Sequence, residues 1–262
     1  MEEDLTLRVS LVQQDIVWED KQANLKYIHS VISQLAGKTD LVVLPEMCTT
    51  GFSMNSHILA ETISGETISK LKQWAVQYNI AICDSFIAED KGQYYNRGFF
   101  ITPVKEHYYD KRHLFRMGSE PESFSSGKKR LVVELKGFNI CLLVCYDLRF
   151  PVWARNVDNE YDLLVYVANW PASRSNVWNA LLIARAIENM SYVCGVNRIG
   201  ADGNGLKYEG SSKMINARGE EIITIALNQE LVETVCISKR ELEKFRAKFP
   251  VWKDADSFNI EI

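Results

Sequence analysis

The sequence lacks the cysteine patterns that mark zinc sites and disulfide frameworks. Its six cysteines stand at positions 48, 83, 141, 145, 194 and 236, with no Cys-x-x-Cys pair and no grouped Cys and His ligands. Cys141 and Cys145 would lie about 13 Å apart on one strand, which is beyond the reach of a disulfide bond. We therefore expect six reduced thiols and no metal site.

Long hydrophobic runs and an excess of positive charge are also missing. The longest apolar runs, at 140–146 and 163–168, are strand-sized and far short of the roughly 20 residues of a membrane span. The 30 Lys and Arg residues against 34 Asp and Glu give a net charge of -4, which offers no electrostatic footprint for nucleic acid or membranes. The acidic start lacks the features of a secretion signal. We expect a cytoplasmic protein that acts on a small molecule.

No linker, charge block or internal repeat divides the 262 residues, which favours one domain over 1–262. Short runs rich in Val, Ile and Leu alternate with segments of helical period, which predicts an α/β fold with two sheets. The predicted strands are 7–13, 41–44, 80–88, 98–102, 107–109, 131–134, 138–144, 163–168 and 192–196, with a closing meander at 211–215, 221–226 and 231–236. The predicted helices are 24–35, 64–78, a segment carrying Trp153 and Val157, 175–190 and 239–248.

Two segments interrupt this alternation. Residues 111–130 contain Gly118, Pro121 and Gly127 without a clear period, and a loop this long inside a compact domain is usually functional. Residues 200–210 are polar and rich in glycine, and we expect a loop there.

Three residues with reactive side chains follow predicted strands where the chain enters a loop. Glu46 comes after Leu-Val-Val-Leu-Pro, Lys111 after His-Tyr-Tyr-Asp, and Cys145 after Cys-Leu-Leu-Val. Taken singly, such a cysteine is typical of a buried inert thiol, and the other two of solvated loop charges. Together they fit catalysis, because a thiol with a pKa of about 8.5 needs a nearby base or cation to become a nucleophile.

The motifs around these residues resemble those of the carbon-nitrogen hydrolase family, the nitrilase superfamily. The matching pieces are Leu-Pro-Glu46-Met, Tyr-Asp-Lys111-Arg-His-Leu-Phe and Cys145-Tyr-Asp-Leu-Arg-Phe-Pro-Val-Trp, and the likeness extends over nearly the whole chain. It implies a four-layer α-β-β-α sandwich with a Glu-Lys-Cys triad. Residues 49–54 and 166–174 look most like the bacterial omega-amidases, which hydrolyse the terminal amide of 2-oxoglutaramate and related 2-oxo acids.

The resemblance implies a role for each residue of the triad. Glu46 removes the thiol proton of Cys145, and the thiolate attacks the amide carbonyl. Lys111 and the backbone N-H of Tyr146 hold the oxyanion, ammonia leaves, and water releases the acid from a thioester. Glu120 stands about where the family carries an additional glutamate that orients substrate and lysine. The alternative for Glu120 is a solvated loop acid.

Substrate binding is predicted from residue chemistry within this resemblance. A 2-oxo dicarboxylate monoamide keeps one carboxylate, which a guanidinium from Arg116 or Arg174 matches in shape and charge. Phe52 and Trp170 are candidates for the pocket wall, with core or rim positions as the alternative. Arg149 matches a position shared by several branches of the family, so we expect a structural role with an acidic partner.

Other readings stay open at this point. Within the family, the substrate alternatives are N-carbamoyl amino acids, aliphatic amides and nitriles. Outside it, a Cys-His hydrolase would use His107 or His113, although no third group that would orient His113 is evident, and a non-catalytic interaction protein would keep only the fold. The resemblance implies no cofactor and a homodimer built around the helices that flank the nucleophile. The apolar tail from 249 onward packs against its own chain or a neighbour.

The remaining cysteines are divided by their surroundings. Cys83, Cys141, Cys194 and Cys236 lie in strand-like apolar segments, where we expect them to pack in the core. Cys48, two residues from Glu46, stays undecided.

Overall fold

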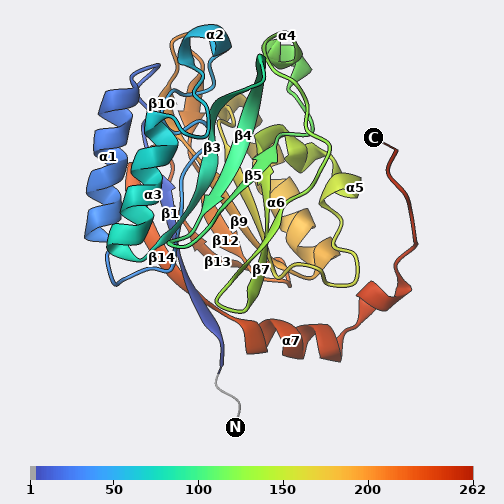
Figure 1. Ribbon diagram of the computed structural model, residues 1–262. Coiled ribbons are helices and arrows are strands. Elements are labelled where there is room, and N and C mark those ends of the chain that lie inside the picture. Colours follow the sequence, from blue (N-terminus) through green and yellow to red (C-terminus); the bar gives the residue numbers. More distant parts are fainter. Residues whose placement is uncertain (1–3, 262) are drawn as a thin grey trace.

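The computed structural model describes residues 4–261, which form a sandwich of four layers (Figure 1). In these residues, two six-stranded mixed sheets stack face to face, and helices cover the outer face of each sheet. The arrangement confirms the predicted α-β-β-α sandwich.

The first sheet has the strand order β14-β1-β2-β3-β4-β5. Its β1, β2 and β3 are parallel to one another, and the remaining pairs are antiparallel. Its strands are β1 (Thr6–Gln13), β2 (Leu41–Val43), β3 (Ala81–Asp90), β4 (Gln93–Ile101), β5 (Glu106–Asp110) and β14 (Leu231–Ser238).

The second sheet repeats this plan in the order β13-β12-β9-β8-β7-β6. Its parallel centre is β7, β8 and β9, flanked by antiparallel pairs. Its strands are β6 (Val132–Leu135), β7 (Phe138–Val144), β8 (Leu163–Ala168), β9 (Tyr192–Asn197), β12 (Lys213–Ile215) and β13 (Glu221–Thr224).

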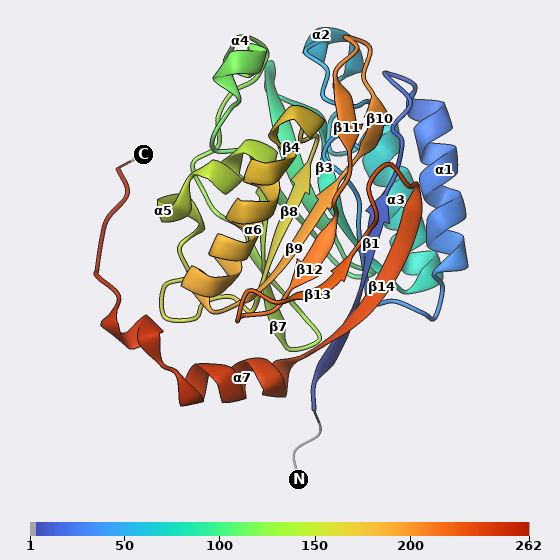
Figure 2. The same cartoon turned by 180° about the vertical axis from the view of Figure 1, so that it is seen from behind.

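Helices lie on both outer faces, as Figures 1 and 2 show from opposite sides. On the first sheet lie α1 and α3, on the second α5 and α6, while α7 follows β14 along one end of the sandwich. Beyond it the tail stands away from the sandwich, with Phe258 and Ile260 exposed. The helices are α1 (Lys21–Gln34), α2 (Ser56–Leu59), α3 (Glu66–Tyr78), α4 (Glu120–Ser123), α5 (Pro151–Ala154), α6 (Ser175–Asn189) and α7 (Lys239–Lys248).

The side chains of β2 show why the central strands of the two sheets are apolar on both faces. Leu41 and Val43 pack into the core between the two sheets, whereas Val42 packs outward against Leu25 and Ile28 of α1. Because side chains alternate across a strand, both faces of a central strand in such a sandwich are buried. The carboxyl ends of β2 and β7 therefore emerge from a rigid, dry core.

The predicted closing meander is wrong in its third strand. β12 and β13 pair with each other, but β14 crosses to the first sheet and pairs with β1 from Thr6↔Ser238 to Gln13↔Leu231. The β1 edge needs hydrogen-bond partners, and β14 supplies them over the full length of that strand. Gln13 fixes the crossing, because its side-chain amide donates to the backbone oxygens of Ala226 and Gln229 at 2.8 and 3.0 Å.

Two helix and loop predictions also need correction. Val157 lies outside the helix that carries Trp153, because α5 ends at Ala154 and the next residue is extended. Residues 200–210 are not a plain loop, because β10 (Ile199–Ala201) pairs with β11 (Lys207–Glu209) as an antiparallel hairpin.

The prediction of core packing is confirmed for three of the four cysteines and wrong for the fourth. Cys83, Cys141 and Cys194 are buried, but Cys236 is exposed, because it lies on the open face of the edge strand β14. Cys48 is completely buried.

No helix in residues 4–261 has the length and apolar composition needed to cross a membrane. Within the same residues, no group of three or more His, Cys, Asp and Glu side chains is arranged to hold a metal ion.

Candidate active site

The two sheets bring the predicted triad together from three strand ends. Glu46 follows β2, Lys111 follows β5 and Cys145 follows β7. The ammonium of Lys111 lies 2.9 Å from Oε1 of Glu46, and both side chains are completely buried. The thiol of Cys145 lies beside this pair, because the charges of Glu46 and Lys111 both shift its pKa, in opposite directions.

Glu120 joins this cluster from the long segment after Lys111. Its Oε1 accepts from the Lys111 ammonium at 3.0 Å, and its Oε2 accepts from the backbone N-H of Phe115. Glu120 is completely buried in α4, so the alternative of a solvated loop acid is wrong. The fold of residues 111–120 therefore places a second carboxylate on the same ammonium.

Asn96 of β4 links the two carboxylates, and nothing in the sequence analysis singled it out. Its side-chain N-H₂ group donates to Oε1 of Glu46 at 2.8 Å and to Oε1 of Glu120 at 3.0 Å. Each of these carboxylate oxygens therefore has donors from both Asn96 and Lys111.

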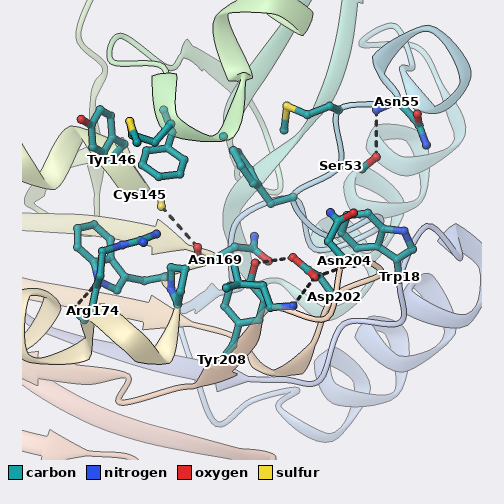
Figure 3. Close-up of a pocket in the computed structure, with 18 of the residues that line it drawn as sticks. Trp18, Ser53, Asn55, Cys145, Tyr146, Asn169, Arg174, Asp202, Asn204 and Tyr208 are labelled. Carbon is teal, nitrogen blue, oxygen red and sulfur yellow. Dashed lines mark hydrogen bonds between the residues drawn. The ribbon is translucent and has the colours of Figure 1, made fainter.

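Asn169, at the end of β8, fixes the other side of Glu46. Its backbone N-H donates to Oε2 of Glu46 at 2.8 Å, and its side chain donates to the Glu46 backbone oxygen at 2.5 Å. The Asn169 backbone oxygen lies 3.9 Å from the sulfur of Cys145 (Figure 3). Glu46 is thus held by donors from both sheets.

Burial and charge shape the proton affinities in the cluster. Burial alone would lower the pKa of Lys111, but the Glu120 and Glu46 carboxylates outweigh it and raise that pKa. Burial raises the pKa of Glu120, and Glu46 adds to the rise against the opposing effect of Lys111. Burial and the Glu46 carboxylate also raise the pKa of Cys145 well above its ordinary value. The resting site therefore contains a neutral thiol beside a cation, and a base is needed to generate the thiolate.

Cys145, the predicted nucleophile, stands on a sharp turn. Cys145 has a φ of 45°, in the left-handed region that a residue with a side chain rarely adopts. The buried carboxylate of Asp147 fixes this turn, because it accepts from the backbone N-H of Val144 at 3.1 Å and from the Tyr109 hydroxyl at 2.7 Å. The strained conformation is held by the surrounding structure.

His113 has the acidic partner that its sequence neighbourhood did not reveal. Its backbone N-H and Nδ1 lie 3.0 and 2.8 Å from Oδ1 of Asp147, and its ring stacks on Phe150 with centroids 3.8 Å apart. The expectation that no third group orients His113 is therefore wrong. The histidine nevertheless supports the turn, while the groups acting on Cys145 are Glu46, Lys111 and Glu120.

A cavity of about 630 Å³ opens above the nucleophile, and Figure 3 shows Cys145 in its wall. Phe52, Trp170 and Arg174 line it, as predicted from the sequence. Arg116 does not line it and is exposed in a short 3-10 turn. Glu46, Lys111 and Glu120 lie behind the cavity wall, which keeps their charges out of water.

Arg149 is placed differently from its predicted structural role. Its side chain lines the cavity and lies over the Trp170 ring, with the guanidinium carbon 5.1 Å from the centroid. Arg174 lies over Phe115 at 5.3 Å. Among the residues that the structure describes, neither guanidinium forms an ion pair, so the expected acidic partner of Arg149 is not there.

Part of the cavity wall comes from segments to which the sequence analysis gave no role. Trp18, before α1, and Asp202 and Tyr208 of the β10–β11 hairpin line the cavity together (Figure 3). The only sequence signal was the turn-forming run Asp202-Gly-Asn-Gly, in which the Asp202 carboxylate accepts from two backbone N-H groups at 2.9 Å.

Comparisons with known proteins agree with this geometry. The sequence pattern of the carbon-nitrogen hydrolase family matches residues 8–248. The chain is 44% identical over 255 residues to an omega-amidase, YafV, of Escherichia coli K12, covering 97% of this chain and 98% of that protein. It is 30% identical to the 2-oxoglutaramate amidase of Bacillus subtilis, covering 94% of this chain and 96% of that one.

A solved structure gives the same result at the level of the fold. A CN-hydrolase superfamily protein of Xanthomonas campestris, which carries an arsenic adduct in its active site, superimposes with a TM-score of 0.95. It is 42% identical and covers 99% of this chain and 100% of its own. The chain therefore belongs to the carbon-nitrogen hydrolase family, and it is a hydrolase of amide carbon-nitrogen bonds.

Proposed function

We propose that this protein hydrolyses the terminal amide of a small 2-oxo dicarboxylic acid monoamide, such as 2-oxoglutaramate. One observation carries the proposal: the buried Glu46–Lys111 pair stands at Cys145, beneath a cavity that two guanidiniums line. The pair supplies the base and the oxyanion donor for attack of Cys145 on an amide, and the guanidiniums suit a substrate that keeps a carboxylate. The names of the relatives from E. coli and B. subtilis point to the same substrate class.

The first half of the reaction forms a thioester. Glu46 takes the thiol proton of Cys145 as the sulfur attacks the amide carbon, which gives a tetrahedral oxyanion. The Lys111 ammonium and the backbone N-H of Tyr146, which follows the nucleophile in its turn, stabilise that oxygen. The carbon-nitrogen bond then breaks, the nitrogen takes the proton from Glu46, and ammonia leaves.

The second half returns the enzyme to its starting state. Glu46 removes a proton from a water molecule, which attacks the thioester carbon. The carbon-sulfur bond breaks, the sulfur of Cys145 takes the proton back, and the carboxylic acid leaves. Glu120 and Asn96 touch Lys111 and Glu46 rather than the reacting atoms, so we assign them to positioning.

Arg174 and Arg149 are the candidates for the substrate carboxylate. Both line the cavity on the side of the nucleophile, stacked on aromatic rings that hold the guanidinium planes in place. Phe52 and Trp170 supply apolar wall for the short carbon chain.

An ammonia-release assay tests the substrate class. We expect 2-oxoglutaramate and 2-oxosuccinamate to be hydrolysed faster than succinamate, an N-carbamoyl amino acid or a nitrile. Preference for the carbamoyl compound or the nitrile would overturn the assignment in favour of another branch of the family.

Three further features stay predictions: a single domain over 1–262, a cytoplasmic location and a homodimer. The dimer rests on the family resemblance, and light scattering after gel filtration tests it. A monomer at the concentrations of the assay would contradict it.

A further inference from the structure

One wall of the cavity is assembled from two segments that are far apart in the sequence. Trp18 comes from the connection between β1 and α1, and Asp202 and Tyr208 come from the β10–β11 hairpin. Figure 3 shows Trp18 and Asp202 on the side of the cavity away from Tyr146 and Arg174. We refer to this part of the cavity lining, Trp18 together with Asp202 and Tyr208 of the hairpin, as the far wall.

Arg198, which does not line the cavity, joins these two segments. Its Nη2 donates to the Ile16 backbone oxygen at 2.9 Å and to the Asp15 carboxylate at 3.1 Å, both just before Trp18. Its Nε and Nη2 donate to the backbone oxygens of Ile199 and Ala201 in β10 at 2.9 and 3.1 Å.

The Arg198 guanidinium also contacts the second strand of the hairpin, β11, through Tyr208. Its carbon lies 4.8 Å from the centroid of the Tyr208 ring, and the hydroxyl of that ring donates to Asp202 at 2.9 Å. Arg198 therefore contacts β10, the Tyr208 ring and the loop that carries Trp18.

The two segments fit closely where they meet. A Cβ atom at Gly203 would stand 2.3 Å from Nε1 of Trp18, so the hairpin backbone approaches the indole more closely than a side chain would allow. The position of Trp18 thus depends on the position of the hairpin, and both depend on the bonds made by Arg198.

The burial of Arg198 has to be explained by these bonds. Its side chain is completely buried, and removing a guanidinium from water is costly unless its donors are satisfied. Its Nε and Nη2 have acceptors, whereas its Nη1 has none among the described residues. Its only charged partner in the described residues, Asp15, is half-exposed, so the three backbone oxygens supply most of its buried acceptors. An apolar side chain would fill the same space but would leave those oxygens without donors.

We propose that Arg198 is a positioning residue that fixes the far wall and thereby sets how tightly the substrate is held. The inference rests on the proposed amidase function. Because Arg198 has no contact with Glu46, Lys111 or Cys145 in the hydrogen bonds of the described residues, its loss should weaken substrate binding and leave the chemical step nearly intact.

The test compares Arg198→Lys and Arg198→Met with a matched control, Arg246→Lys. Arg246 is likewise buried and binds one carboxylate, that of Asp162, and the backbone oxygens of Met190 and Tyr161, one backbone oxygen fewer than Arg198, but it lies outside the cavity. Steady-state kinetics with 2-oxoglutaramate are measured for each protein, together with the melting temperature. Alkylation of Cys145 by iodoacetamide, followed by mass spectrometry, reports on the nucleophile independently of turnover.

For Arg198→Lys we expect KM to rise by about tenfold or more while kcat changes by less than about threefold, since a lysine has no planar fork of donors. Arg198→Met should raise KM further, whereas Arg246→Lys should lower the melting temperature and leave KM unchanged. Asp15→Asn, which removes only the exposed partner, should fold and raise KM in the same direction.

An unchanged KM in both Arg198→Lys and Asp15→Asn would overturn the proposal, and so would a loss confined to kcat. Failure of the proposed function looks different, because the wild-type protein would then not hydrolyse 2-oxoglutaramate at all. The kinetic comparison is in that case made with the amide that the wild-type protein does use, and the same two outcomes decide it.

Discussion

Nζ of Lys111 lies 3.0 Å from Oε1 of Glu120, and both side chains are completely buried. Since Glu120 touches this ammonium, Asn96 and the Phe115 backbone, its carboxylate holds in place the group that we propose as oxyanion donor. We predict that Glu120→Gln lowers kcat by about a hundredfold, in the range found when an oxyanion donor is disturbed. Glu122→Gln, an exposed neighbour in α4, is the control and should retain full activity. Turnover of Glu120→Gln within about threefold of wild type would contradict this role.

Substitution of His113, beside the nucleophile turn, and of His107, in β5, separates the Glu-Lys-Cys mechanism from a Cys-His mechanism. His113 bonds to Asp147 and steadies the nucleophile turn, so His113→Gln should lower kcat by less than about tenfold. His107→Gln should behave like wild type, whereas Glu46→Gln should remove nearly all turnover. The pH profile of kcat/KM in the two histidine variants is the measurement. Abolished activity in His113→Gln with Glu46→Gln still active would favour the Cys-His alternative.

Substitution of Arg174 and Arg149 tests whether these residues bind the carboxylate of the substrate. Replacing Arg174 or Arg149 by Met should raise KM for 2-oxoglutaramate by about tenfold to a hundredfold, as expected when a charged hydrogen-bond partner is lost. Arg116→Met is the control, because that side chain is exposed and outside the cavity. Equal KM values in all three variants would remove these guanidiniums from substrate binding.

Asp84 of β3 predicts a pH dependence of stability. It is completely buried, and burial raises its pKa well above the ordinary value, with the Glu46 carboxylate adding to the rise. The backbone N-H of Cys48 donates to its carboxyl group at 3.1 Å, and the Cys48 thiol and the Ser85 backbone N-H also oppose the rise. Asp84 therefore sits beside the segment that carries Glu46.

The sign of the effect follows from proton binding. Between about pH 4 and its raised pKa, Asp84 keeps a proton in the folded protein that the unfolded chain releases, so the free energy of unfolding falls as the pH rises. The fall is up to about 1.4 kcal/mol per pH unit. Asp84→Asn removes this penalty, and its gain in melting temperature over wild type should grow between pH 5 and pH 8. With Asp256→Asn in the exposed tail as the control, a gain that does not grow with pH would contradict the prediction.

The sequence predicted the parts of this molecule that depend on local patterns. Central strands such as β8, and β7 after Asn139, are uninterrupted apolar runs because both their faces are buried, and α1 shows its helical period in Leu25, Ile28 and Ile32. The triad was identifiable because each member follows a predicted strand within a motif, Glu46 and Cys145 after apolar runs and Lys111 after His-Tyr-Tyr-Asp. The pairing of β14 with β1 depends instead on which distant edge is free, and no local pattern carries that information.

The rest of the site was beyond sequence reasoning for a related reason. Asn169 reaches Glu46 from the other sheet, and Asn96 reaches it from two strands away in the same sheet. As isolated asparagines, both look like turn or surface residues. Arg149 was expected to have an acidic partner because it matches a position shared by several branches of the family, but its guanidinium faces an aromatic wall of the cavity. Arg198 lies within an apolar strand-to-hairpin connection, and only the structure reveals what it joins.

The central claim is that Cys145 carries the acyl group of the substrate as a thioester. Intact-mass spectrometry of wild-type enzyme, quenched in acid during turnover of 2-oxoglutaramate, tests it most directly. We predict an added mass equal to the substrate minus ammonia, located on the peptide that contains Cys145, and no such mass in Cys145→Ala, which stays folded and inactive. Wild-type turnover by Cys145→Ala, or an acyl adduct that persists in it, would contradict the mechanism.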